Sequence, residues 1–182
     1  GPTGIGVLWG KAELLDAMPP FMGGGGMIRD VRFDGIIPAE IPARFEAGTP
    51  PIAEAVGLSA AIEYLDGIGM DNILDHDIAL TDYALRSLEQ QFGKDIVVMG
   101  PNTTDDRGGV LSLALKDIHP HDLAQVLDES GVCIRAGHHC AKPLMRRLGK
   151  SATARASFYL YNDTTDVDKL IDALEKADSL FG

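Results

Sequence analysis

The 182-residue sequence is poor in cysteine and in basic residues, and each shortage excludes a class of protein. Two cysteines are too few for the disulfide framework of a small secreted domain. Only 16 Lys and Arg stand against 27 Asp and Glu, and the net charge of −11 repels nucleic-acid phosphates and anionic lipid. No apolar run reaches the roughly 18 to 20 residues that span a bilayer. We therefore expect a soluble, cytoplasmic protein with no nucleic-acid and no membrane partner.

The first residues lack the usual start of a complete chain. The opening "GPTGIGVLWG" has no Met and turns at once into an apolar run, Ile5 to Trp9, that is typical of a strand. We therefore expect a portion of a longer protein. A short helix follows in "KAELLDA" and ends before Pro19 and Pro20. The next stretch, 23–50, begins with four glycines but lacks the Lys-Ser/Thr ending of a P-loop, so we expect it to be irregular.

Helical periodicity dominates the middle of the sequence. Apolar residues spaced by threes and fours predict one helix over 52–68, ended by Gly67 and Gly69. A longer helix follows, and it carries one apolar stripe that is expected to be buried. The residues of this stripe are Leu74, Ile78, Thr81, Leu85, Leu88 and Phe92.

From about residue 95 the spacing of apolar residues alternates between that of a strand and that of a helix. The expected strands are 95–100, 108–115, 132–135 and 155–162, and the expected helices are 120–130, 144–148 and 164–180. This order predicts the α/β class, with an α+β arrangement in which helices cover one face of a small antiparallel or mixed sheet. We divide the chain into an end portion of one domain, 1–70, and a small C-terminal domain, 71–182.

The stretch "CIRAGHHCAKPLM" places two histidines directly before a cysteine. Adjacent His138 and His139 diverge in an extended loop, and the sequence has no C-x-x-C or H-x-x-x-H partner, so we predict no metal site. Cys133, between Val132 and Ile134, is predicted to be a buried strand residue.

Cys140 has two open interpretations on local chemistry. Most free cysteines fill space as small apolar residues. Cys140, however, lies in a Gly-His-His loop near Arg135 and Lys142, where exposure and positive charge favour a nucleophilic thiolate. The residues alone favour neither reading.

The longer segment "RAGHHCAKPLM" resembles the R-x-G-H-H-C-A-x-P-L signature of the SUF-type (group II) cysteine desulfurases, which are pyridoxal-phosphate enzymes of the class V aminotransferase family. "GPTGIGVLWG", "GGGGMI", "RFEAGTP" and "RASFYLYN" resemble further segments of that family in the same order. The resemblance covers essentially the whole chain. It implies the C-terminal part of a PLP-dependent transferase type I fold, with the end of the large PLP-binding domain at 1–70 and the small domain at 71–182.

The resemblance also implies roles for single residues. Cys140 corresponds to the catalytic nucleophile, which takes the sulfur of L-cysteine as a persulfide and leaves L-alanine. Arg155 corresponds to the arginine that binds the substrate carboxylate. Thr49 and Gly48 correspond to residues that reach the phosphate of pyridoxal 5'-phosphate in the other subunit of a homodimer.

Arg135, His138 and His139 flank the thiol and are expected to support its loop. The Schiff-base lysine of the family lies in a Ser-x-His-Lys stretch, and no lysine of this sequence has that context. The chain alone is therefore expected to be inactive. The resemblance implies that the complete enzyme passes sulfur to an acceptor or scaffold protein of iron–sulfur cluster assembly. A selenocysteine lyase-type relative and a non-catalytic sulfur-relay or docking module are the alternatives.

Overall fold

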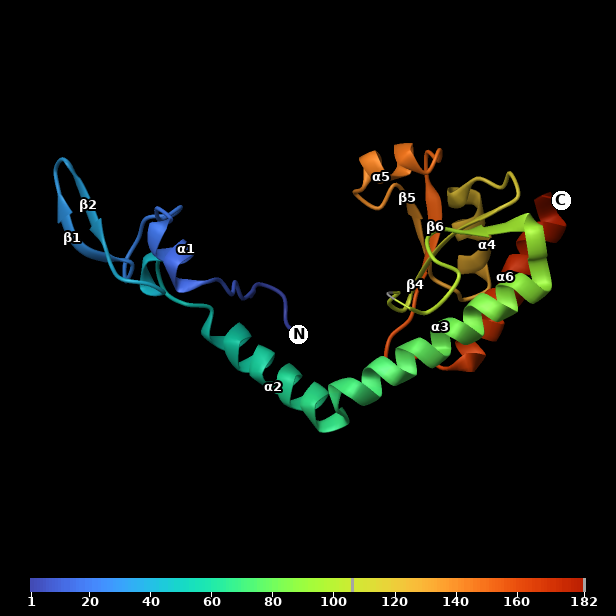
Figure 1. Cartoon of the computed structure of the whole chain (residues 1–182), viewed down its shortest axis with the longest axis horizontal. Helices are drawn as coiled ribbons and strands as arrows, with labels where there is room; N and C mark the ends of the chain where they lie inside the picture. The colour runs from blue at the N-terminus through green and yellow to red at the C-terminus, as the bar shows by residue number, and fades with distance from the viewer. Residues whose placement is uncertain (106, 182) are drawn as a thin grey trace. The chain divides into compact units, whose positions relative to one another are not determined.

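A computed structural model describes residues 1–105 and 107–181 of the chain. The chain divides into two compact units, Gly1–Ile68 and Gly69–Gly182, each of which is described by itself. Gly69 has a φ of +92°, a left-handed conformation that L side chains rarely adopt, and it separates two long helices. The elements of both units are labelled in Figure 1.

The first unit contains little regular structure before its final helix. Its elements are α1 (Ala12–Ala17), β1 (Ile28–Arg32), β2 (Gly35–Pro38), the 3-10 helix η1 (Ala43–Phe45) and α2 (Ile52–Ile68). The Arg44 guanidinium joins two of its segments, because Nε donates to the Ala39 carbonyl at 3.1 Å and Nη1 donates to the Asp16 carbonyl at 2.9 Å. The short first helix and the helix over 52–68 are confirmed.

The strand predicted for Ile5 to Trp9 is wrong. Val7, Leu8 and Trp9 are 82%, 79% and 82% exposed, and the run is not paired with any strand among the described residues. A strand needs a neighbour for its backbone hydrogen bonds. Within the described residues of this unit, β1 and β2 pair only with each other. This antiparallel hairpin lies in the stretch 23–50, which was predicted to be irregular. Its side chains are mostly exposed, so its sequence has no alternation of apolar and polar residues that would predict a strand.

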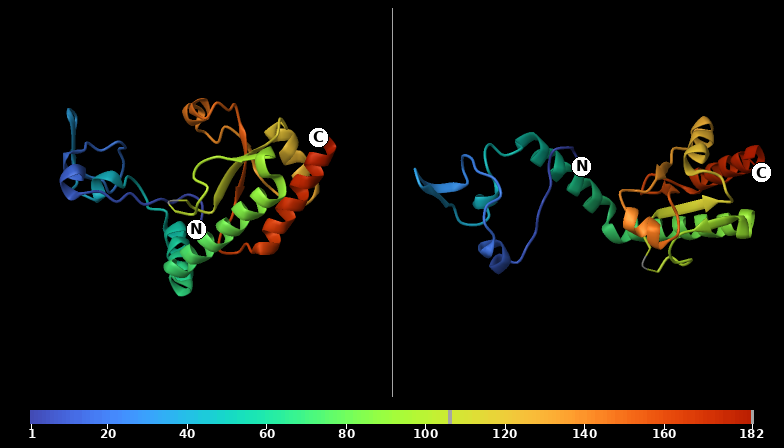
Figure 2. Two further views of the ribbon diagram at one scale, coloured as in Figure 1. Left: turned by 45° about the vertical axis from the view of Figure 1, so that its right-hand side comes forward. Right: turned by 90° about the horizontal axis from the view of Figure 1, so that it is seen from above.

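The second unit is a four-stranded antiparallel sheet with helices. Its strands lie in the order β3-β4-β6-β5, and each neighbouring pair is antiparallel. Of the two predicted kinds of sheet, antiparallel or mixed, the structure has the antiparallel one. Figures 1 and 2 show α3 and α6 side by side. Its elements are α3 (Met70–Phe92), η2 (Gly93–Asp95), β3 (Ile96–Val98), β4 (Val110–Leu115), α4 (Pro120–Glu129), β5 (Arg135–Gly137), α5 (Lys142–Arg147), β6 (Thr153–Ser157) and α6 (Thr164–Phe181).

The core of this unit lies between one face of the sheet and the helices α3, α4 and α6. Leu111, Leu113 and Leu115 alternate along β4 and are all buried, as their spacing predicts. Ala154 of β6 pairs with Leu113 and Ala156 pairs with Leu111, so both alanines lie on the same face. The predicted arrangement of helices on one face of the sheet is confirmed by this single hydrophobic cluster.

The predicted buried stripe of α3 is wrong in its first half. Leu74 is 56% exposed and Ile78 is 36% exposed, whereas Thr81 and Leu88 are buried as predicted. Apolar residues occur on two neighbouring faces of this helix. The fold buries the face that carries the small Ala84, whose lack of bulk permits close packing, together with Ile73 and Leu80. None of the helices in residues 1–105 and 107–181 is both long and apolar enough to cross a membrane.

Truncating the centre of the core should unfold the second unit more easily. We expect Leu113→Ala to lower the free energy of unfolding by about 2 to 5 kcal/mol, because a fully buried leucine leaves a cavity. Val110→Ala is the matched control on the same strand, where the side chain is 45% exposed, and should cost less than about 1 kcal/mol. Urea denaturation measures both, and equal losses would contradict the assignment of the core.

Candidate active site

The sheet face opposite the helices carries arginine side chains from two strands. Ala154 faces the helices, so Thr153 and Arg155 point to the other face of β6. Arg135 is the direct partner of Arg155 across the β5–β6 ladder. The predicted carboxylate-binding and loop-supporting arginines therefore lie side by side, although 20 positions separate them in the sequence.

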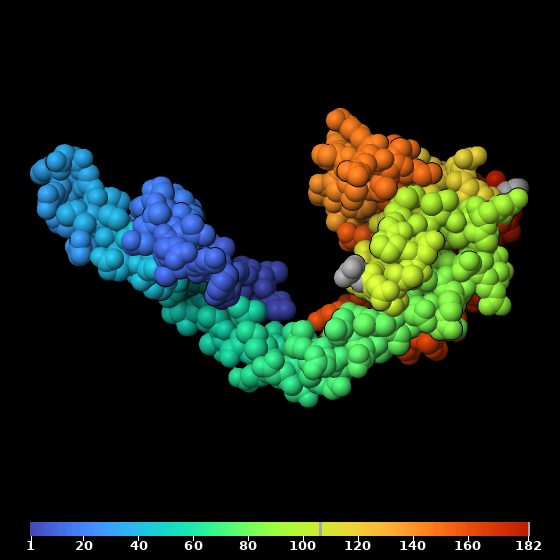
Figure 3. Space-filling model, in the orientation of Figure 1, coloured from blue at the N-terminus to red at the C-terminus, as the bar shows by residue number. Residues whose placement is uncertain are grey.

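The thiol loop begins where β5 ends at Gly137. Cys140 is exposed, and the loop with α5 stands at the surface of this unit, in orange in Figure 3. His139 and Cys140 have φ values of +53° and +58°, left-handed conformations that cost a non-glycine residue about 1 to 2 kcal/mol each. Such strain persists only where other contacts hold the chain in place.

Both predicted histidines hold this loop. The Cys140 amide donates to Nδ1 of His138 at 3.1 Å, and the Ala141 amide donates to the His138 carbonyl at 2.9 Å. Nε2 of His139 lies 2.8 Å from Oγ1 of Thr153, within hydrogen-bonding distance. His138 thus stabilises the turn itself, whereas His139 connects the turn to β6.

The thiol has a cationic neighbour. Nη2 of Arg135 donates to Sγ of Cys140 at 3.5 Å. This contact places a positive charge directly beside the sulfur atom. Arg135, His138, His139 and Cys140 therefore form one group, and Thr153 links that group to the strand that carries Arg155.

Arg155 has hydrogen-bonding capacity that the described residues do not use. Its Nε is buried and has no hydrogen-bond partner among them. No carboxylate in that part of the chain forms an ion pair with Arg155 or with Arg135. A buried N–H group without an acceptor is costly. This face of the sheet therefore suits an anion, and a carboxylate matches the planar fork of arginine.

The charges on this face also act on His139. Burial lowers the pKa of His139 below its usual value of 6.5, and the positive charges of Arg155 and Arg135 lower that pKa further. His139 is therefore neutral in the folded protein at neutral pH.

This lowered pKa makes stability depend on pH in a defined direction. Between the His139 pKa and 6.5 the unfolded chain binds a proton that the folded chain does not. The free energy of unfolding should therefore fall as the pH drops from 6.5 through that pKa. Urea midpoints measured between about pH 7 and about pH 5 check this prediction. The variant His139→Asn, which tolerates the left-handed backbone, should show a flatter profile, and identical slopes would refute the role of His139.

The prediction that Cys133 is a buried strand residue is wrong. Cys133 is exposed and precedes β5, whose pairing begins only at Arg135. Val132 and Ile134 on either side pack against the core, so the alternation of side chains turns Cys133 outward. Its Sγ lies 3.8 Å from an Asp128 carboxylate oxygen, and both cysteines are free thiols.

Gly48 and Thr49, the predicted phosphate contacts, lie in the first unit. Gly48 has a φ of +87° and its amide donates to the Gly25 carbonyl at 2.7 Å. Apart from Gly48 and its two chain neighbours, none of the described residues has a heavy atom within 4 Å of the position that a Cβ of Gly48 would take, and Thr49 is exposed. The open space at Gly48 and the exposed Thr49 side chain leave room for a phosphate group to approach, so the role of these two residues as phosphate contacts stays a prediction.

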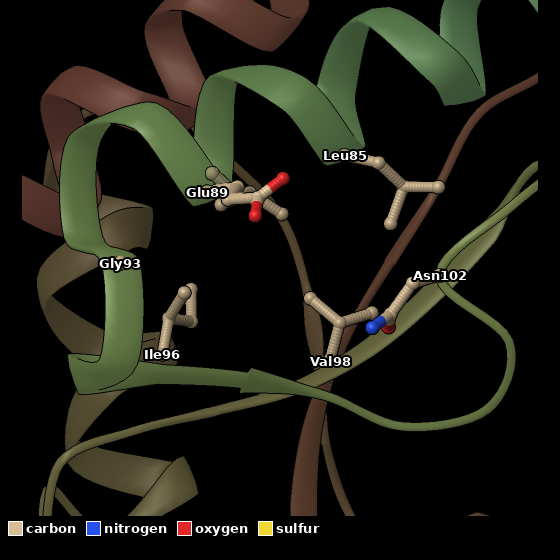
Figure 4. A pocket seen from close by; sticks show the side chains of 7 residues that line it. Leu85, Glu89, Gly93, Ile96, Val98 and Asn102 are labelled. Atoms are coloured by element: carbon tan, nitrogen blue, oxygen red, sulfur yellow. The ribbon is translucent and has the colours of Figure 1, made fainter.

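Two pockets in the described part of the second unit lie at other residues. One, of about 210 Å³, lies between α3 and β3 and includes Leu85, Glu89, Ile96, Val98 and Asn102, as Figure 4 shows. Another, of about 270 Å³, includes Cys133 and none of the predicted site residues. Among residues 1–105 and 107–181, no group of three or more His, Cys, Asp or Glu could hold a metal ion.

Thr153 is the site residue that the sequence reasoning missed. It is fully buried and polar, and its hydroxyl lies against His139. The spacing between Thr153 and Arg155 could have predicted this position. Residues two apart on a strand lie on the same face, and Thr153 comes two residues before Arg155.

Comparison with known proteins finds one family model and close relatives. The aminotransferase class-V family model matches residues 1–170. A probable cysteine desulfurase of Streptomyces coelicolor is 54% identical over 182 residues, which are 100% of this chain and 43% of the relative. A cysteine desulfurase of Haloferax volcanii is 50% identical over 181 residues, 100% of this chain and 42% of the relative. The chain thus spans less than half the length of these relatives.

Solved structures of cysteine desulfurases and related proteins have a similar fold. The Escherichia coli cysteine desulfurase CsdA, in an S-sulfonic acid form, matches with a TM-score of 0.90 and 39% identity, over 99% of this chain and 44% of that one. A C-DES mutant with glycine covalently linked to its PLP cofactor matches with a TM-score of 0.70. At 20% identity, over 90% of this chain and 40% of that one, the second likeness shows the fold alone.

Proposed function

The chain belongs to the aminotransferase class-V family, and from this membership we propose that the complete polypeptide is a cysteine desulfurase that stores sulfur on Cys140. Membership confirms the resemblance seen in the sequence, and the match to the C-terminal part of cysteine desulfurase structures confirms the α/β fold class. The observation that best supports the proposal is the exposed Cys140 loop beside Arg135, on the sheet face where Arg155 has a buried Nε with no partner among the described residues.

In this proposal the residues of the chain bind and attack the substrate. Arg155 holds the carboxylate of L-cysteine, and the Cys140 thiolate attacks the substrate sulfur. A sulfur–sulfur bond forms and the substrate carbon–sulfur bond breaks. The products are L-alanine and a Cys140 persulfide, so the atoms of L-cysteine and one thiol are all accounted for, and no external oxidant is needed.

The cofactor belongs to the proposal as well. Pyridoxal 5'-phosphate, when bound, supplies the electron sink that makes the substrate carbon–sulfur bond breakable. Thr49 and Gly48 are the residues of this chain that would contact its phosphate, across the interface of a homodimer. No lysine of this chain has the Ser-x-His-Lys context, so we propose that the 182-residue chain alone is inactive.

The test compares two proteins. The complete polypeptide with pyridoxal phosphate, L-cysteine and a reductant should form alanine and sulfide, and the 182-residue chain should form neither. Alanine formation by the isolated chain at the same rate would refute its inactivity. Faster turnover of L-selenocysteine than of L-cysteine by the complete polypeptide would instead favour a selenocysteine lyase.

The destination of the sulfur is a further part of the proposal. We propose that the exposed Cys140 persulfide passes its terminal sulfur to an acceptor or scaffold protein of iron–sulfur cluster assembly in the cytoplasm. Adding such an acceptor should increase the rate of turnover without a small-molecule reductant. A stable complex between the acceptor and the chain, with no turnover by the complete polypeptide, would favour a docking module.

A further inference from the structure

Thr153 occupies an unusual position on the open face of the sheet. It is fully buried, although α3, α4 and α6 cover the opposite face, and its hydroxyl has Nε2 of His139 as a neighbour at 2.8 Å. Gly137, the residue opposite Thr153 in the ladder, has a φ of +129°, which directs the chain away from the strand path at this point. The thiol loop thus leaves β5 opposite Thr153, and His139 returns to contact it.

Two side-chain bonds connect this strained loop to the sheet in the described part of the chain. One is the His139–Thr153 contact, and the other is the donation from Arg135 to Sγ of Cys140. The hydrogen bonds of His138 lie within the loop and cannot fix its position on the sheet. The Arg135 bond uses the sulfur atom that reacts, so it changes whenever Cys140 gains or loses a substituent. Of these two bonds between described residues, the His139–Thr153 bond is the one that does not depend on the state of the thiol.

We propose that Thr153 and His139 are positioning residues, whose hydrogen bond holds the Cys140 loop at a fixed place beside the strand that carries Arg155. This inference rests on the proposed desulfurase function. L-Cysteine is short, so a carboxylate held at Arg155 places the substrate sulfur within a small volume. Thr153 lies on the same strand and face as Arg155, and its bond to His139 sets where the nucleophile stands relative to that volume.

The bond can be removed from either end. Thr153→Val replaces the hydroxyl by a methyl group of the same size, and Thr153→Ser restores the hydroxyl. His139→Asn keeps a residue that tolerates the left-handed backbone but is too short to reach Thr153. Thr81→Val is the matched control, because Thr81 is 1% exposed and its hydroxyl has no hydrogen-bond partner among the described residues.

Hydrogen exchange in the complete polypeptide tests the proposal without substrate. A peptic peptide that covers residues 138–141 and excludes Cys133 reports on the thiol loop, because pepsin cleaves under the acidic conditions that retain the deuterium label. We expect Thr153→Val and His139→Asn each to speed exchange in this peptide about tenfold, with Thr153→Ser and Thr81→Val like the unmodified protein. The double variant should exchange no faster than the faster single variant.

Kinetics give a second readout. Thr153→Val should lower kcat for L-cysteine about tenfold and change KM by less than about twofold, because Arg155 is intact. Unchanged exchange in both Thr153→Val and His139→Asn would overturn the proposal. Equal acceleration by Thr153→Val and Thr153→Ser would also overturn it, since packing and not the hydroxyl would then be responsible. Absence of turnover in the unmodified polypeptide would refute the desulfurase function, while the exchange result would still decide whether this bond holds the loop.

Discussion

Replacing Cys140 by serine in the complete polypeptide is expected to lower the rate of alanine formation from L-cysteine by about 10³-fold or more. A serine hydroxyl is nearly isosteric with the thiol but is not ionised at neutral pH, so it cannot attack the substrate sulfur. The substitution leaves the backbone hydrogen bonds of the loop in place, because the Cys140 amide and the Ala141 amide donate irrespective of the side chain. The loss should therefore appear in kcat and leave the thermal stability nearly unchanged.

Cys133 provides the matched control for this experiment. It is the other free, exposed cysteine, and it lies outside the group formed by Arg135, His138, His139 and Cys140. Cys133→Ser should keep the full rate. If the Cys140→Ser variant retained more than about a tenth of the activity, or if both variants lost it equally, Cys140 would not be the nucleophile.

The second large effect is expected at Arg155. Arg155→Lys keeps the positive charge but loses the planar pair of donors, so we expect kcat/KM for L-cysteine to fall about 30- to 100-fold, mainly through KM. Arg86→Lys is the control, because Arg86 is an exposed helix residue paired with Asp82 at 2.7 Å and should have no effect on kcat/KM.

Stability separates a binding role of Arg155 from a structural one. Arg155 and Arg135 are direct partners across the ladder, and like charges in that position repel each other. Arg155→Gln should therefore leave the free energy of unfolding unchanged or raise it by up to about 0.5 kcal/mol, while substrate binding is lost. A large loss of stability together with normal KM would assign Arg155 to the fold.

Local pattern could predict part of this architecture. The alternation of Leu111, Leu113 and Leu115 was sufficient to identify a strand with one buried face, and the spacing over 52–68 was sufficient to identify a helix. Both signals arise within a single element, because burial follows the period of that element. The hairpin β1–β2 has mostly exposed side chains and gives no such signal.

The candidate site depends on relations between elements. The side-by-side position of Arg135 and Arg155 follows from the register of β5 against β6, which no local pattern specifies. The same is true of the bond between His139 and Thr153, which joins residues 14 positions apart. Sequence motifs identified the thiol, its histidines and both arginines through resemblance. The strand pairing is what brings them to one face and makes Thr153 part of the group.

The transfer of sulfur to Cys140 can be measured directly. The complete polypeptide is incubated with pyridoxal phosphate and L-cysteine in the absence of reductant, digested with trypsin, and analysed by mass spectrometry. The peptide 136–146 should gain the mass of one sulfur atom, and a reductant should remove it as sulfide. Formation of alanine without that gain, or a gain of sulfur at Cys133 in its place, would contradict the assignment of Cys140 as the sulfur carrier.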